Sequence, residues 1–257
     1  MLNLDKKDSR ILFELDRNSR QSIHQLAQKT KLSRDTVAYR IRQLEKKGVI
    51  QKYITIIDFT KLGYSILRLY LKLQNTTPEI EENMAQFFVQ QQNTLTVYKT
   101  DGEYQLAVGF LIKDMQSFQN IYSPFLQKYR HYISGKNIST FLDYIHLHRN
   151  YLVEKKLHDS TAISTGSFTL FSYDEKDLRL LNLIKENARI TLLELAQKLN
   201  MTATGVKYKL KNLEKGRVIV AYKLLLNTSL LGYEYYKVDL ELEDINILPS
   251  LNQFTIQ

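Results

Sequence analysis

Cysteine is absent from the 257 residues of the sequence, and this absence excludes a disulfide scaffold, a thiolate zinc site and a cysteine nucleophile. No apolar run approaches the roughly 18–20 residues of a membrane span, and the charged N-terminus lacks the apolar stretch of a signal peptide. The glycine-rich motifs of nucleotide-binding and hydrolase loops are also missing. We therefore expect a soluble, cytoplasmic protein that has no cofactor and is not an enzyme.

Positive charge is in excess, with 36 Lys and Arg against 27 Asp and Glu and a formal net charge of +9. The excess lies in two segments, because residues 1–60 carry +6 and residues 173–232 carry +5. Residues 61–150 carry only +2, and residues 233–257 carry −4. Concentrated positive charge of this kind favours binding to the phosphates of a nucleic acid.

An internal repeat organises the chain. Residues 4–73 align with residues 173–242 without a gap at an offset of 169, and 24 of the 70 aligned positions are identical. Composition bias cannot hold one offset over that length, so we interpret the match as a duplicated module.

The first 60 residues of the module predict three short helices followed by a strand. The first helix is expected to end near Asn18, and Ser22 and Ser33 are placed to cap the second and third. Gly48 fits the C-terminal stop of the third helix, and residues 49–57 are β-branched and aromatic enough for a strand. Three helices with a tight turn between the last two, then a strand, predict a winged helix-turn-helix.

Residues between the two copies predict a different fold. Alternating leucines indicate a half-buried strand, Thr77-Pro78 suits a helix start, and Asp101-Gly102 is a strong hairpin signal. The order β-α-β-β-α-β is the ferredoxin-like plan. We expect these elements at 67–73, 77–91, 94–100, 103–111, 115–129 and 138–147.

The fold class is therefore α+β, with winged helix-turn-helix domains and a ferredoxin-like domain, duplicated with the second copy incomplete. Gln257 aligns with Phe88, so the second module stops inside its first sheet-domain helix. Such a βα fragment cannot bury both faces alone, so we expect it to pack on another domain, unless the chain is truncated. The expected segments are winged helices at 1–60 and 173–232, a ferredoxin-like domain at 61–150, a linker at 151–172 and the incomplete domain at 233–257.

The third helix of each copy supplies the candidate DNA-binding residues. With its apolar stripe facing the core, each helix turns a largely basic face outward, with long donors and a planar tyrosine. The capped N-termini can bind phosphate. The candidates are Ser33, Arg34, Asp35, Thr36, Tyr39, Arg40, Arg42, Gln43 and Lys46 in the first copy, and Thr202, Thr204, Lys207, Tyr208, Lys209, Lys211 and Lys215 in the second.

Within the first copy we assign different roles to these side chains. Tyr39 and Arg42 are expected to contact base edges or sugars, whereas Arg34, Arg40 and Lys46 are expected to neutralise phosphates. The competing interpretation is a solvated basic face on an ordinary helical domain, because a fold alone does not establish a function.

Many spaced positions of the first module match one pattern together: Leu4, Asp5, Asp8, Ile11, Leu12, Leu26, Ala27, Leu32, Ser33, Val37, Arg40, Ile41, Leu44, Glu45, Gly48, Val49 and Ile50. The pattern resembles the Lrp/AsnC family of transcription regulators, and the resemblance extends over essentially the whole chain. It implies a sequence-specific regulator of double-stranded DNA that forms a dimer or larger homo-oligomer through its sheet domain. It also implies a small-molecule effector such as an amino acid.

A dimer of this kind would place two first-copy helices, residues 33–47, in successive major grooves about 34–36 Å apart. The second copy departs from the first in two ways. Gly216-Arg217 replaces Lys47-Gly48, which predicts a shifted helix end, and Gly205 within the helix costs about 1 kcal/mol relative to alanine. The second copy is therefore the weaker candidate for DNA binding.

The sheet domain also departs from the family that the sequence resembles. The Gly-x-x-Asp of that family, after the second strand, corresponds here to Gly102-Glu103-Tyr104-Gln105. Gln105 cannot supply a carboxylate for an amino group, which argues against an amino acid as the effector. The candidate effector-binding residues are Asp101, Gly102, Glu103 and Gln105.

Two further features of the sequence concern a metal site and an enzyme. His146 and His148 share one face of the last expected strand, but a metal site needs more ligands than they provide, so we expect no metal. Siroheme decarboxylases resemble the same two-domain architecture, but no cluster of arginine and histidine marks a tetrapyrrole pocket. The third alternative is a co-regulator that binds another protein through its basic helices.

Overall fold

The two repeats fold alike because the same caps and apolar spacings occur in both. The first consists of α1 (Lys6–Arg17), α2 (Ile23–Thr30), α3 (Arg34–Lys46) and β1 (Ile50–Ile57). The second consists of α6 (Glu175–Glu186), α7 (Leu192–Leu199), α8 (Ala203–Lys215) and β8 (Ile219–Leu226). The expected three helices and strand are confirmed in each copy. The computed structural model describes residues 4–146, 149–153, 163–166, 169–234, 236, 238, 240, 243 and 244.

Caps fix where the short helices begin. Ser22 begins α2 with a reciprocal capping box to Gln25, and Thr191 begins α7 in the same way with Glu194. Each cap satisfies backbone N–H groups that would otherwise lack an acceptor. Asn18 is the C-cap of α1, as the sequence predicts.

The third helices end at equivalent residues. Helix α3 ends at Lys46 and Gly48 follows with φ +73°, whereas α8 ends at Lys215 and Arg217 follows with φ +55°. The expected shift of the second helix end, based on the position of Gly216, is therefore wrong. The backbone geometry of the stop is retained, and Arg217 adopts the left-handed conformation that glycine adopts without a steric penalty.

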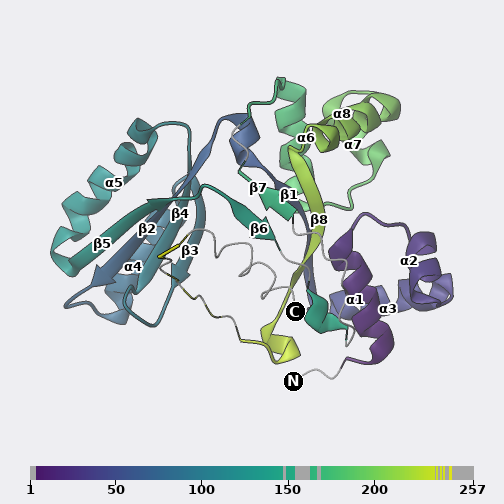
Figure 1. Ribbon diagram of the computed structural model, residues 1–257, viewed down its shortest axis with the longest axis horizontal. Helices are drawn as coiled ribbons and strands as arrows, with labels where there is room; N and C mark the ends of the chain where they lie inside the picture. The colour runs from purple at the N-terminus through teal and green to yellow at the C-terminus, as the bar shows by residue number, and fades with distance from the viewer. Residues whose placement is uncertain are drawn as a thin grey trace. The chain divides into compact units, whose positions relative to one another are not determined.

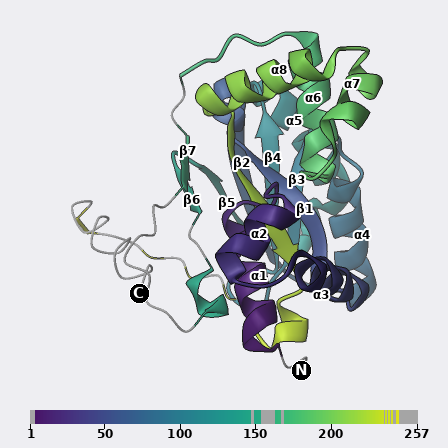
Figure 2. The same cartoon turned by 90° about the vertical axis from the view of Figure 1, so that its right-hand side faces the viewer.

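Strands β1 and β8 form an antiparallel two-stranded ribbon that joins the repeats. Helix α1 packs against β8 and α6 packs against β1, and Leu224 and Leu226 of β8 lie in the core of the first repeat. Figures 1 and 2 show the ribbon with α1–α3 towards one end and α6–α8 towards the other. Each repeat thus completes its core with the strand of the other.

The chain divides into two compact units. Both winged helices belong to the first unit, Met1–Asp58, Ile145–Ser164 and Tyr173–Gln257, and the second unit is Phe59–Tyr144 and Thr165–Ser172. The first unit also contains two 3₁₀ turns, η3 (Asn150–Leu152) and η4 (Ser229–Leu231). Leu152 is buried in the core of the first repeat. The short strands β6 (Tyr144–His146) and β7 (Ile163–Thr165) pair with each other.

The second unit has the expected β-α-β-β-α-β order. Its antiparallel sheet has the strand order β3-β4-β2-β5. Thr77 and Asp114 cap its two helices. The elements are η1 (Phe59–Leu62), β2 (Ser65–Leu73), α4 (Pro78–Val89), β3 (Thr94–Lys99), β4 (Leu106–Ile112), α5 (Met115–Tyr129), η2 (Arg130–Tyr132) and β5 (Ile133–Thr140).

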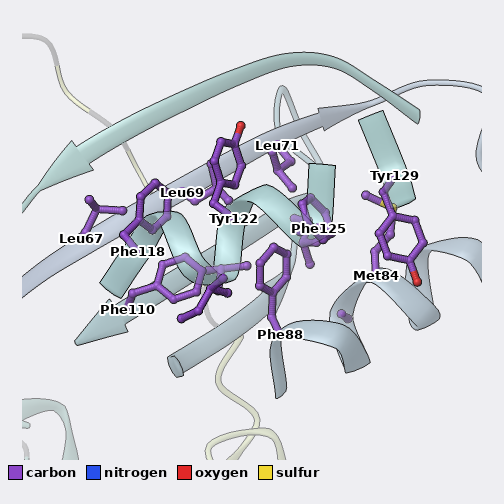
Figure 3. Packing of buried hydrophobic residues seen from close by; sticks show 14 of the residues in the cluster. Leu67, Leu69, Leu71, Met84, Phe88, Phe110, Phe118, Tyr122, Phe125 and Tyr129 are labelled. Carbon is purple, nitrogen blue, oxygen red and sulfur yellow. The ribbon is translucent and has the colours of Figure 1, made fainter. Parts of the chain in front are cut away.

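Aromatic rings fill the space between the sheet and its helices. Phe88 of α4 and Phe125 of α5 are fully buried, with ring centroids 4.3 Å apart. Figure 3 shows Leu67, Leu69 and Leu71 of β2 on the side of the strand that faces these rings. The alternation of leucines in β2 therefore places one face of the strand in the core, as the sequence predicts.

Two strand boundaries were predicted wrongly. Strand β4 starts at Leu106 rather than at residue 103. The backbone N–H of Thr100 donates to the carbonyl oxygen of Gln105, and this hydrogen bond leaves residues 101–104 in the turn. The last strand of the sheet is β5, which ends at Thr140 instead of spanning 138–147. Its first half, Ile-Ser-Gly-Lys-Asn, has weak strand propensity, and pairing with β2 overrides that preference.

The expected incomplete second ferredoxin-like domain, residues 233–257, lies largely outside the described residues. Residues 154–162 of the expected linker also lie outside them.

Candidate nucleic-acid interface

Helix α3 presents the exposed face that the sequence predicts. Val37, Ile41 and Leu44 are buried, and the opposite side of the helix is accessible. The ring of Tyr39 is 58% exposed on this side. The exposed candidates on and before α3 are Ser33, Arg34, Asp35, Tyr39, Arg42 and Lys46, while Thr36 and Gln43 are half-buried.

Helix α8 repeats this arrangement with different side chains. Val206, Leu210 and Leu213 are buried, and Tyr208 is 73% exposed at the position equivalent to Tyr39. The exposed candidates are Thr202, Thr204, Lys207, Tyr208, Lys211 and Lys215. Asn212 is also exposed on this face, as helical periodicity predicts.

The N-termini of both helices are capped by hydroxyl groups. Ser33 Oγ accepts the backbone N–H of Thr36 at 3.2 Å, and Thr202 Oγ1 accepts that of Gly205 at 3.1 Å. Thus Gly205 does not prevent α8 from forming. In each helix the first turn still has backbone donors at the positive end of the helix dipole, where an anionic phosphate is favoured.

Arg40 and its equivalent Lys209 have partners within their own repeats. Arg40 Nη1 lies 2.7 Å from Asp5 Oδ2 and 2.8 Å from Asp8 Oδ1. The backbone N–H of Asp8 and the Arg40 guanidinium together lower the pKa of Asp5. Arg40 therefore ties α3 to the start of α1, a structural contact that the expected phosphate-binding role did not include.

Lys209 makes the same connection in the second repeat. Its Nζ lies 2.8 Å from Asp174 Oδ2 and 2.9 Å from Asp177 Oδ1. The Lys209 ammonium and the backbone N–H of Asp177 lower the pKa of Asp174 to about 2. The sequence contained a signal for these ion pairs, because two acidic residues and one basic residue recur at aligned positions. They are Asp5, Asp8 and Arg40 in the first repeat and Asp174, Asp177 and Lys209 in the second.

Reciprocal contacts beside the β1–β8 ribbon hold the two repeats together, and we call the ribbon with these contacts the seam. Arg20 Nη1 donates to Ala188 O at 2.7 Å, and Arg189 Nη1 donates to Ser19 O at 3.1 Å. The Arg20 guanidinium carbon lies 5.3 Å from the centroid of the Tyr222 ring. At the aligned positions, the guanidinium carbon of Arg189 lies 5.1 Å from the centroid of the Tyr53 ring.

Backbone bonds follow the same two-fold pattern. Ser19 N donates to Tyr222 O at 2.9 Å, and Ala188 N donates to Tyr53 O at 2.8 Å. Because each contact has a counterpart shifted by 169 residues with the repeats exchanged, the seam relates the two winged helices by a pseudo-two-fold axis.

The seam also reaches the third helices. The Tyr53 hydroxyl donates to Glu45, in the last turn of α3, and the Tyr222 hydroxyl donates to Glu214, in the last turn of α8. Burial, reinforced by these hydrogen bonds, raises the pKa of both tyrosine hydroxyls. The sequence contained a signal for these contacts, because Arg20, Tyr53 and Glu45 are identical to their equivalents in the second repeat. It contained no signal that β1 pairs with β8.

The candidate effector residues form one exposed turn. Asp101, Gly102 and Glu103 are exposed, whereas the Gln105 side chain is occupied by the backbone. Its Oε1 accepts the backbone N–H of Leu73 at 2.8 Å, and its Nε2 donates to Gly102 O at 2.6 Å. The amide therefore holds the turn against β2.

His146 is half-buried in the first unit, and burial together with the positive Lys223 and Arg149 lowers its pKa to about 4. His148 lies outside the described residues. In the part of the chain that the structure describes, no group of three or more histidine, aspartate or glutamate residues is arranged to hold a metal ion. Every described helix is too short or too polar to span a bilayer.

Comparisons with known proteins agree with this geometry. Residues 4–51 and 173–220 each match the model of a winged helix-turn-helix DNA-binding family. An HTH-type transcriptional regulator of Pyrococcus furiosus is 33% identical over 132 residues, which are 51% of this chain and 82% of that protein.

Two solved structures resemble the fold. An AsnC family transcriptional regulator from Agrobacterium tumefaciens matches with a TM-score of 0.50 and 18% identity, over 57% of this chain and 95% of its own. The siroheme decarboxylase NirDL matches with a TM-score of 0.58 and 14% identity, over 86% of this chain and 65% of its own. At these identities the two structures show a shared fold alone. The sequence match to the Pyrococcus furiosus regulator and the two winged helices establish that the chain belongs to the HTH-type, DNA-binding transcription regulators.

Proposed function

We propose that the protein binds specific sequences of double-stranded DNA with α3 and α8. The observation that supports this most directly is the pair of exposed third helices, each with a capped N-terminus, basic side chains and an exposed tyrosine. A helix of this kind fits the major groove, where each base pair presents a distinct set of donors and acceptors. The proposed interface omits Arg40 and Lys209, because carboxylates already bind them.

Within α3 the roles follow from reach and charge. Arg42 and Tyr39 are exposed on the outward face and would contact base edges or sugars, while Arg34 and Lys46 would neutralise phosphates. On α8, Lys211 occupies the position of Arg42, and Lys207 and Lys215 add positive charge. Clustered positive charge raises affinity for any duplex, so specificity must come from the few side chains that reach bases.

The test is a binding measurement on the whole chain, by selection from random duplexes and by fluorescence anisotropy. Arg42→Ala should weaken binding to the selected duplex by about 1–3 kcal/mol and relax the base preference at one position. Lys128→Ala, at an exposed lysine of the second unit, is the control and should change neither. Unchanged base selection by the Arg42→Ala variant would refute the assignment, and failure of the parent chain to bind any duplex at low salt would favour a protein-binding co-regulator.

The remaining expectations stay proposals. We propose that the second unit mediates self-association and effector control, as the family resemblance implies, with Asp101 and Glu103 as the exposed polar groups of its turn. Light scattering on the intact chain tests the first point, since a monomer at micromolar concentration would refute it. We propose further that the protein acts in the cytoplasm on DNA and has no enzymatic activity. The absence of a spectral shift on addition of siroheme would eliminate the siroheme decarboxylase alternative, whereas decarboxylation of added siroheme would contradict the proposed lack of activity. The domain boundaries at 60, 150, 172 and 232 also remain proposed.

A further inference from the structure

The outward faces of α3 and α8 differ in chemistry at equivalent positions. Arg42 corresponds to Lys211, and Gln43 corresponds to Asn212. An arginine can bond guanine O6 and N7 together through its planar fork, whereas a lysine presents a single point of charge. Glutamine and asparagine can each bond adenine through two atoms, but from side chains that differ in length by one methylene. At these two positions the helices therefore differ in reach and in the number of hydrogen bonds that they offer to a base.

The first turns differ as well. The exposed Asp35 of α3 corresponds to the exposed Thr204 of α8, and Arg34 corresponds to Ala203. A carboxylate accepts a hydrogen bond from cytosine N4 but repels phosphate, whereas a threonine hydroxyl is neutral and serves as donor or acceptor. The difference between the two reading surfaces thus extends along the helices.

The seam contains an equally clear departure from two-fold symmetry at its centre. In the β1–β8 register Ile54 lies opposite Lys223, and these two positions are equivalent in the repeats. Lys223 is 5% exposed, and its Nζ lies 3.2 Å from Oδ2 of Asp16, which is 1% exposed. Asp16 has no acidic equivalent, because the second repeat has Lys185 at that position.

This asymmetry decides which repeats can pair. Pairing of two second repeats in the same register would place Lys223 opposite Lys223, with Lys185 where the compensating Asp16 would be. Buried like charges without a counter-ion are strongly unfavourable. Pairing of two first repeats would remove Lys223 from beside Asp16. The charge pattern therefore favours the seam in which one first repeat meets one second repeat.

We propose that the chain is a pair of unequal DNA-reading heads, and that the site read by one chain consists of two different half-sites rather than two like ones. The inference rests on the proposed function and goes beyond it by specifying the target. Because α3 and α8 are joined in one unit through the seam, every binding unit contains one of each. A symmetric operator would match one helix and mismatch the other.

The experiment is selection of random duplexes by the intact chain, followed by binding to synthetic duplexes built from the selected halves. If the halves are named A and B, the proposal expects duplex AB to bind at least about tenfold more tightly than AA or BB, which is the effect of roughly one mismatched base pair. Arg42→Ala should relax base preference in one half only, and Lys211→Ala should relax it in the other half only. Lys128→Ala again serves as the control.

The outcomes separate the two proposals. Enrichment of a site whose two adjacent half-sites are alike, AA or BB, or equal binding to AA and AB, would overturn the unequal-heads proposal while leaving DNA binding by α3 in place. Two self-associated chains would instead select AB followed by its inverted copy. A motif with one half alone, insensitive to Lys211→Ala, would also overturn it. If no duplex is enriched from the library, the proposed function itself is refuted.

Discussion

Asp16 offers the most direct test of the seam, because its buried carboxylate joins three parts of the first unit. One oxygen of Asp16 accepts from Lys223 Nζ of β8, and the other accepts from Nη1 of Arg149. Nη1 of Arg149 also donates to the carbonyl oxygen of Leu224 at 2.9 Å. The Asp16 side chain is only 1% exposed, so solvent screens these ion pairs weakly.

Replacing the carboxylate should therefore be costly. Asp16→Leu removes the carboxylate that pairs with the buried Lys223 ammonium, and breaking a buried ion pair in this way typically destabilises by about 3–5 kcal/mol. Lys223→Ile installs the residue found at the equivalent position of the first repeat. It leaves Asp16 its bond from Arg149, so the expected loss is about 1.5–3 kcal/mol, the value of one hydrogen bond to a charged group.

The double variant distinguishes an ion pair from a packing defect. In Asp16→Leu with Lys223→Ile the uncompensated lysine charge is gone, so the double variant should be less destabilised than the sum of the single changes by about 1–3 kcal/mol. Lys99→Ile, which removes the exposed partner of Glu82 in the second unit, is the control and should stay within about 1 kcal/mol of the parent.

The assay is urea unfolding followed by circular dichroism and tyrosine fluorescence, since the chain has no tryptophan. The reasoning is refuted if Asp16→Leu changes the free energy of unfolding by less than about 1 kcal/mol. Strict additivity in the double variant would also refute it, because independent sites do not couple.

Three further predictions concern the winged helices. Arg217→Gly should raise the free energy of unfolding by about 0.5–1 kcal/mol, because glycine takes a positive φ without strain. For the same reason Gly48→Arg should lower the free energy of unfolding by about 1–2 kcal/mol. A stabilising effect of Gly48→Arg would contradict this reasoning. The pKa of Asp174 is lowered from an ordinary 3.8 to about 2, so its ion pair with Lys209 stabilises the fold fully above about pH 4. That stabilisation is lost as the pH falls towards 2 and the carboxylate is protonated. Lys209→Met should flatten that part of the stability curve, and an unchanged curve would count against the pair. Lys46→Ala should make the slope of log K against log salt shallower by about 0.9, as expected for one lost phosphate contact; an unchanged slope in the anisotropy titration would show that Lys46 contacts no phosphate.

Local chemistry made much of the fold predictable. Ser22 and Ser33 cap the helices that they were expected to cap, and β3 and β4 form a hairpin around Asp101-Gly102 with a wider turn than expected. These features depend on a few neighbouring residues, so one sequence contains the information for them. Strand β5 was misplaced because Gly135 and its polar neighbours join the sheet only through pairing with β2, a partner more than 60 residues away.

The candidate interface was predictable for the same local reason, with one instructive failure. Helical periodicity placed Tyr39 and Arg42 outward correctly, because a helix presents its faces at a fixed angle per residue. It could not show that Arg40, at the edge of the apolar stripe, reaches the carboxylates of Asp5 and Asp8. That contact depends on how α3 crosses α1, which the spacing of residues in α3 does not encode.

The seam was the least predictable feature, and duplication within one chain explains why it takes this form. In a symmetric dimer of identical chains, a residue on the two-fold axis must face its own copy, so a lysine there would oppose a second lysine. In a tandem chain the same substitution occurs once, and Lys223 faces Ile54 while Asp16 neutralises it. Once one repeat has acquired such a charge, the heterologous pairing is favoured over either homologous one. The third helices held by that seam are then free to diverge, as Arg42 and Lys211 have done, because no self-complementary site constrains them.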